Sequence, residues 1–127
     1  MSTSTIEKKP ILEKETKKIS IEYKALEKAI KNFQICLRNW DTGKLKEDLE
    51  ISLDFNEKLW KIFRSDCESG NCTLPDSIKN NLLSLESFIN RYTKEIKKEP
   101  STKKLDILIA INKNIASGFK NSLGLKA

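Results

Sequence analysis

Apolar residues recur every three or four positions through four successive segments of this 127-residue chain. That spacing places them along one side of an α-helix, whereas no segment alternates apolar and polar residues over the length of a β-strand. The four segments span residues 20–40, 44–66, 75–98 and 101–122, and only short links separate them. Four amphipathic helices joined by short links predict an all-α fold, a small four-helix bundle.

The first 18 residues lack such a stripe. Ser, Thr, Lys and Glu surround Pro10 there, and apolar side chains are sparse. Polar, charged termini of this kind are commonly mobile. We therefore predict a flexible N-terminal segment over residues 1–18, followed by a single helical-bundle domain over residues 19–127.

The second predicted helix, residues 44–66, carries two apolar stripes on different faces. The first contains Leu49, Leu53, Trp60 and Phe63, and the second contains Ile51, Phe55, Leu59 and Ile62. A helix that is apolar on two faces usually packs between neighbours on both sides. We expect this helix to be the central one.

The net charge of +6 is compatible with nucleic-acid binding. However, the basic residues are almost all lysines, with arginine only at positions 38, 64 and 91, and proteins that read base edges favour arginine. We therefore do not expect nucleic acid to be the partner. No stretch approaches the roughly 20 apolar residues of a membrane-spanning helix, and the start MSTSTIEKKP has no apolar signal core. We expect a cytoplasmic protein without membrane insertion.

The sequence offers little for catalysis. It contains no histidine, no glycine-rich phosphate loop and no G-x-S-x-G motif. Cys36, Cys67 and Cys72 are too few for a zinc site without histidine, and we expect ordinary reduced thiols. We predict a protein that is not an enzyme and that uses no metal and no cofactor.

Three asparagines interrupt the apolar stripes, at Asn56, Asn81 and Asn112. A buried amide without hydrogen-bond partners costs about 1–3 kcal/mol, so we expect these amides to be satisfied. They could pair with other polar groups inside the bundle and set the helix register. Alternatively, they could line a groove in which the backbone of a partner supplies the missing bonds. Both interpretations stay open from the residues alone.

Three blocks of the chain resemble the FlaF family of flagellar biosynthesis proteins. They are NEKLWKIFRSDC (56–67), LPDSIKNNLLSLESFINRYT (74–93) and LDILIAINKNIASGF (105–119). They match the family pattern Asn-x-x-Leu-Trp-x-x-Phe-x-x-Asp, then Leu-Pro and Asn-Leu-Leu-Ser-Leu with a Phe and an Arg, and finally Leu-Ile-x-Ile-Asn-x-x-Ile-Ala-x-Gly. The resemblance covers about the C-terminal two-thirds of the chain, while the lysine-rich N-terminal segment departs from it.

The resemblance implies a cytoplasmic, non-enzymatic helper of flagellum assembly. Such a protein would bind flagellin and support its synthesis and export, acting beside an FlbT-like regulator. We expect an apolar groove on the second to fourth helices to hold an amphipathic helix of the client. The candidate partner-binding residues are Asn56, Trp60, Phe63, Asn81, Leu85, Phe88, Arg91, Asn112 and Ile115.

A second hypothesis is post-transcriptional regulation through the FlbT-like regulator or through flagellin messenger RNA. The basic segment 91–127 is its support in the sequence. The two hypotheses differ in salt dependence, because binding of messenger RNA through lysines weakens steeply with ionic strength and an apolar groove does not.

Overall fold

The computed structural model describes residues 2–70 and 76–122, with side chains from Thr16 onward except those of Ile78 and Ser122. It consists of four α-helices, α1 (Ser2–Arg38), α2 (Leu45–Glu68), α3 (Asp76–Lys98) and α4 (Thr102–Ser122), with no strand in those ranges. The all-α prediction is confirmed, and apart from the start of α1 every helix end lies within two residues of its expected position. Pro75, the expected first residue of the third helix, lies outside the described residues.

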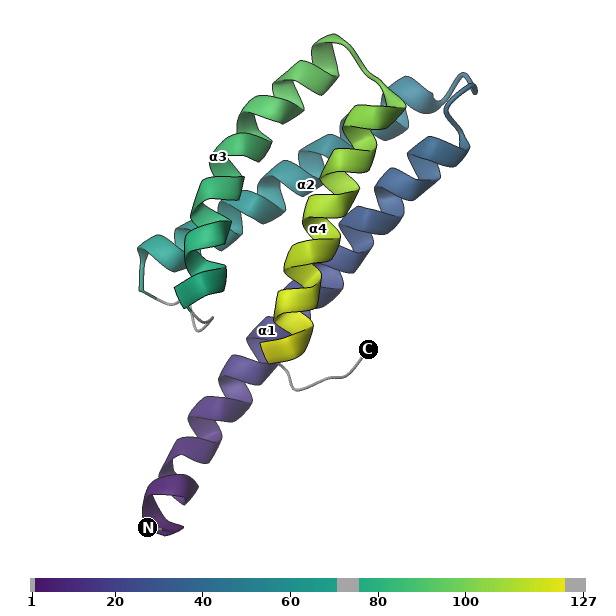
Figure 1. Cartoon of the computed structure of the whole chain (residues 1–127). Coiled ribbons are helices and arrows are strands. Elements are labelled where there is room, and N and C mark those ends of the chain that lie inside the picture. The colour runs from purple at the N-terminus through teal and green to yellow at the C-terminus, as the bar shows by residue number, and fades with distance from the viewer. Residues whose placement is uncertain (1, 71–75, 123–127) are drawn as a thin grey trace.

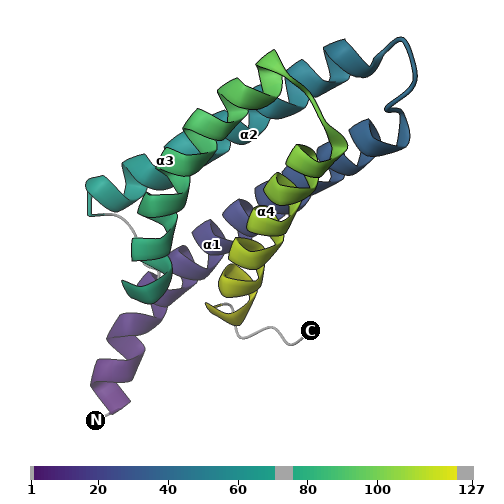
Figure 2. The ribbon, with the colours of Figure 1, turned by 45° about the horizontal axis from the view of Figure 1, so that its top comes forward.

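The helices form a ring in which α1 contacts α2 and α4, and α3 contacts the same two helices. Figures 1 and 2 show α1 beside α4, and α2 beside α3. The helices α2 and α4 are therefore diagonal to each other across the bundle. Of the four neighbouring pairs, α3 and α4 make the least extensive backbone contact.

The helix α1 begins much earlier than the stripe predicts. Its backbone is helical from Ser2 and includes Pro10, and its first turns extend past the other three helices (Figures 1 and 2). The expected flexibility of residues 1–18 concerns motion and stays a prediction.

Local sequence signals explain several helix ends. The Oγ of Ser101 accepts a hydrogen bond of 3.1 Å from the backbone N–H of Lys104, as an N-cap does, and α4 begins at the next residue. Gly70 has a positive φ of 81° just beyond the end of α2. Glycine adopts this conformation without the strain that a Cβ would cause.

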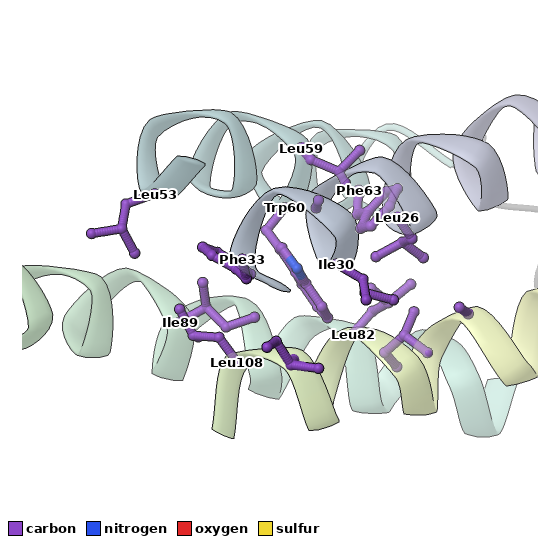
Figure 3. Close-up of a cluster of buried hydrophobic side chains, with 14 of the residues drawn as sticks. Leu26, Ile30, Phe33, Leu53, Leu59, Trp60, Phe63, Leu82, Ile89 and Leu108 are labelled. Atoms are coloured by element: carbon purple, nitrogen blue, oxygen red, sulfur yellow. The ribbon is translucent and has the colours of Figure 1, made fainter. Parts of the chain in front are cut away.

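The core lies where the four apolar stripes meet. Figure 3 shows Trp60 reaching from α2 into the middle of this cluster, near Phe33 of α1 and Leu108 of α4. The first stripe of α2 is buried, but the second is buried only in part: Leu59 is 7% exposed, whereas Ile51 and Ile62 are 61% and 54% exposed. The expectation that α2 packs on both stripes therefore holds for Leu59 and for the half-buried Phe55, and it is wrong for Ile51 and Ile62, which face solvent.

Candidate partner-binding surface

Two of the three embedded asparagines form a hydrogen-bonded chain with a tryptophan inside the bundle. Trp60 Nε1 donates to Asn112 Oδ1 over 2.9 Å, and Asn112 Nδ2 donates to Asn56 Oδ1 over 2.7 Å. All three side chains are buried. Because Trp60 and Asn56 belong to α2 and Asn112 to α4, the chain joins the two diagonal helices. For this pair of amides, the structure shows pairing inside the bundle.

This polar chain sets the register of the bundle at some cost. Asn56 Nδ2 has no hydrogen-bond partner among the described residues, and a buried unsatisfied donor costs about 1–3 kcal/mol. The two hydrogen bonds that are made are short, and they are broken if α2 and α4 slide past each other by one residue. Buried polar pairs are known to specify helix register in this way.

Phe63 and Ile115 share the same interior. The ring of Phe63 lies between those of Trp60 and Phe119, with centroid distances of 5.5 Å to each and edge-on geometry. Ile115 is 3% exposed. Five of the nine candidate residues (Asn56, Trp60, Phe63, Asn112 and Ile115) are therefore in the core, where a partner does not reach their side chains while the bundle is closed.

The other four candidates, Asn81, Leu85, Phe88 and Arg91, lie on the surface of α3. Asn81 and Arg91 are exposed, and Leu85 and Phe88 are half-buried against the core. Asn81, Leu85 and Phe88 are spaced four and three residues apart, which places them on one face of the helix. Asn81 shares a pocket with residues of α4, so this face is the one turned toward α4.

An incompletely covered apolar row follows the junction of α3 and α4. Phe88 and Tyr92 of α3 stack with ring centroids 4.9 Å apart. Since α3 and α4 run antiparallel (Figure 1), helical spacing places Ile111 and Ile107 of α4 at the levels of these two rings. Phe88, Tyr92 and Ile111 are half-buried, and Ile107 is 43% exposed. We call Leu85, Phe88, Tyr92, Ile107 and Ile111 the α3–α4 seam.

A polar pocket of about 370 Å³ closes one end of the seam. Amide and hydroxyl side chains dominate its walls, and Ile115 forms its apolar part. The lining residues are Ser77, Asn81, Asn114, Ile115, Ser117, Gly118 and Asn121. Each asparagine amide offers both a donor and an acceptor, which suits the polar backbone groups of a peptide. We call this the amide pocket.

The ionisable side chains of α3 lie on different sides of the helix. Toward α2, the guanidinium of Arg64 donates to the buried carboxylate of Glu86 over 2.7 Å, and hydrogen bonds to Glu86 and Glu68 raise the pKa of Arg64. Toward α4, burial raises the pKa of the Tyr92 hydroxyl, and the nearby carboxylate of Glu95 adds to this effect. Arg91 forms no ion pair with any described residue, so its charge faces solvent.

Within residues 2–70 and 76–122 the arrangement offers no centre for metal chemistry, because no three His, Cys, Asp or Glu side chains lie close enough together to hold an ion. The same part of the chain contains no helix that is long and apolar enough to cross a bilayer. What the surface does offer is apolar contact along the seam and amide hydrogen bonds at its end.

A comparison with protein-family models matches residues 9–119 to the family described as flagellar protein FlaF. The chain belongs to the FlaF family. The match extends over all four helices, so it includes the buried polar chain and the seam together. Comparisons with curated proteins and with solved structures gave no match.

In this FlaF-family protein, the three motif blocks contribute to both the core and the surface. The block that contains Trp60, with Asn112 of the last block, builds the interior, whereas the block on α3 supplies both core residues, Leu82 and Ile89, and surface. The nine candidates do not include Tyr92, Ile107 and Ile111 of the seam. They also omit most of the pocket lining, namely Ser77, Asn114, Ser117, Gly118 and Asn121. The three- and four-residue spacing from Phe88 and Ile111 was the signal that could have found Tyr92 and Ile107.

Proposed function

We propose that this flagellar protein is a non-enzymatic, cytoplasmic chaperone that binds flagellin and supports its synthesis and export. Membership of the FlaF family supports the flagellar role. The observation that carries the binding role is the α3–α4 seam, an apolar row with a stacked aromatic pair where two helices contact each other least.

The seam presents an apolar row against which an amphipathic helix can pack. Such helices bind through apolar residues at positions i, i+3 or i+4, and i+7. Leu85, Phe88 and Tyr92 repeat with the same three- and four-residue spacing, so a client helix aligned with the seam meets one side chain per turn. Each apolar side chain that becomes fully buried contributes about 1.5–3 kcal/mol, before the cost of ordering the client.

The amide pocket supports the same mode of binding. A helix end carries backbone N–H or C=O groups without partners inside the helix. Asn81 and Asn114 can donate to or accept from such groups, and both side chains are exposed at the pocket. Arg91, which faces solvent one turn beyond Phe88, is placed to pair with a carboxylate of the client.

We infer that the segment bound at the seam is an assembly-prone, helical terminal segment of flagellin. When the seam covers the apolar face of this segment, flagellin cannot polymerise prematurely through that face. Burial of apolar side chains responds weakly to salt, in contrast to binding through lysines.

The test is a calorimetric titration of monomeric flagellin into the purified protein at about 0.1 M and about 1 M salt, the range over which screening changes most. The proposal predicts saturable binding with affinities that agree within about three-fold, and delayed flagellin polymerisation at equimolar ratio. An absence of binding at both salt concentrations contradicts the proposed function. Binding that disappears at the higher concentration contradicts the apolar mode.

A further inference from the structure

A second surface, on the opposite side of α4 from the seam, is a groove of about 740 Å³ between α1 and α4. Lysines stand on both walls, Lys24, Lys28 and Lys31 on α1 and Lys113 and Lys120 on α4. The apolar part of the lining is formed by Ile30 and Ala116, which belong to the core cluster. We call this the lysine groove.

Four of the five lysines of this groove have no carboxylate partner in the described part of the chain. Elsewhere on the bundle, lysines pair with carboxylates, as Lys97 does with Asp54 over 2.8 Å and Lys61 with Glu57 over 3.9 Å. Lys24, Lys31, Lys113 and Lys120 form no salt bridge with any described residue. Lys28 differs, because its Nζ lies 5.4 Å from the ring centroid of Phe55 on α2.

The unpaired lysines on each wall are separated by about two turns of an α-helix. Lys24 and Lys31 are seven residues apart, and so are Lys113 and Lys120, which corresponds to about 10 Å along each wall. A guest helix with carboxylates seven residues apart on both flanks therefore meets one lysine with each carboxylate. An apolar stripe between these flanks would rest on Ile30 and Ala116.

The remaining lining residues argue against nucleic acid. Single strands are held by stacking on aromatic side chains and by arginine, but the lining contains no arginine, and its one aromatic residue is Tyr23. Burial and the charge of the neighbouring Glu27 raise the pKa of the Tyr23 hydroxyl.

We propose that the lysine groove is a docking site for an acidic amphipathic helix of a partner protein, separate from the client site on the α3–α4 seam. The charge complementarity of four unpaired lysines and the apolar floor between them together define this partner. The proposal does not depend on flagellin binding, since it uses a different pair of helices.

The test measures fluorescence anisotropy of a labelled synthetic helix that carries a leucine stripe with glutamates seven residues apart on both flanks. The full-length protein is compared with the variant Lys113→Glu/Lys120→Glu and with the control Lys58→Glu/Lys94→Glu, which changes the net charge equally at exposed positions outside the groove. A peptide with glutamine in place of every glutamate and a single-stranded RNA serve as the other probes.

The proposal predicts that the glutamate peptide binds, that the groove variant weakens it at least about ten-fold, and that the control variant changes it less than about two-fold. The glutamine peptide is predicted not to bind. Equal weakening by both variants would show attraction by net charge alone and would overturn the proposal. So would a failure of the glutamate peptide to bind, or binding of RNA with the same dependence on Lys113 and Lys120 in place of the peptide.

Discussion

Trp60 and Asn112 lie 52 positions apart in the chain and on diagonal helices, yet the indole N–H of one donates to the amide oxygen of the other over 2.9 Å inside the bundle. The bond holds α2 and α4 in a single register although their backbones do not pack against each other. It also determines which motif residues are left for a partner, because Asn112 and Asn56 are paired inside the bundle and α3 alone presents the exposed part of the motif.

Replacing Asn112 by alanine tests this relationship. The substitution leaves the buried Trp60 N–H and the Asn56 carbonyl oxygen without their shown partner, so we expect the free energy of unfolding to fall by about 2–4 kcal/mol. Urea denaturation followed by circular dichroism measures this change. Asn114→Ala, at an exposed position on the same helix, is the control and should change stability by less than about 0.5 kcal/mol. Equal stability of the two variants would mean that the polar chain does not form.

Leu59 and Ile62 belong to the same stripe of α2, yet their burial predicts opposite sensitivities to substitution. Leu59 is 7% exposed and Ile62 is 54% exposed. We expect Leu59→Ala to lower the free energy of unfolding by about 2 kcal/mol or more, because it leaves a cavity. Ile62→Ala should alter it by no more than about 0.5 kcal/mol. The midpoints of urea unfolding compare the two directly, and a large loss at Ile62 would show that this side chain is covered after all.

Glu22 should make stability depend on pH. Burial raises its pKa to about 7, Lys18 opposes the shift, and the neighbouring Asp66 adds to it. Since the folded-state pKa is above the ordinary carboxyl value of 4.5, the folded protein retains a proton that the unfolded chain releases. Stability is therefore fully present below about pH 4.5 and declines as the pH rises toward 7.

The variant Glu22→Gln isolates this effect, and the chain has no histidine to titrate in the same window. The side chain is partly solvated, so screening reduces the effect, and we expect a gain of roughly 1 kcal/mol at pH 8 with little change at pH 4. Thermal unfolding at a series of pH values measures it, with Glu95→Gln at an exposed position as the control. If the wild-type curve is flat between pH 5 and 8 and Glu22→Gln changes nothing, the raised pKa is refuted.

Much of this fold could be predicted from the sequence, because helix formation is a local matter. The apolar stripes identified all four helices. Periodicity states which residues share a face, but not whether that face finds a neighbour. For this reason Ile51 and Ile62 were expected to be covered and are not.

The candidate site was less accessible to sequence reasoning for a related reason. Whether an embedded asparagine lies inside or outside depends on a partner far away in the chain. Asn56 and Asn112 are hydrogen-bonded to each other at a separation of 56 positions, whereas Asn81 lines the amide pocket. Only the tertiary packing of the helices distinguishes these cases, and the local sequence pattern does not specify that packing.

Flagellin binding along the α3–α4 seam can be tested with a matched pair of charge insertions. Ile107 is 43% exposed on the seam, and Ile51 is 61% exposed on α2, outside the seam. Both variants, Ile107→Glu and Ile51→Glu, should fold, as circular dichroism can verify, because both side chains contact solvent.

The affinity of each variant for monomeric flagellin is then measured by calorimetry. We predict that Ile107→Glu weakens binding at least about ten-fold, because a carboxylate is then buried against the apolar client, and that Ile51→Glu leaves it within about two-fold of wild type. Equal affinities of the two variants, or a larger loss for Ile51→Glu, would contradict the assignment of the seam.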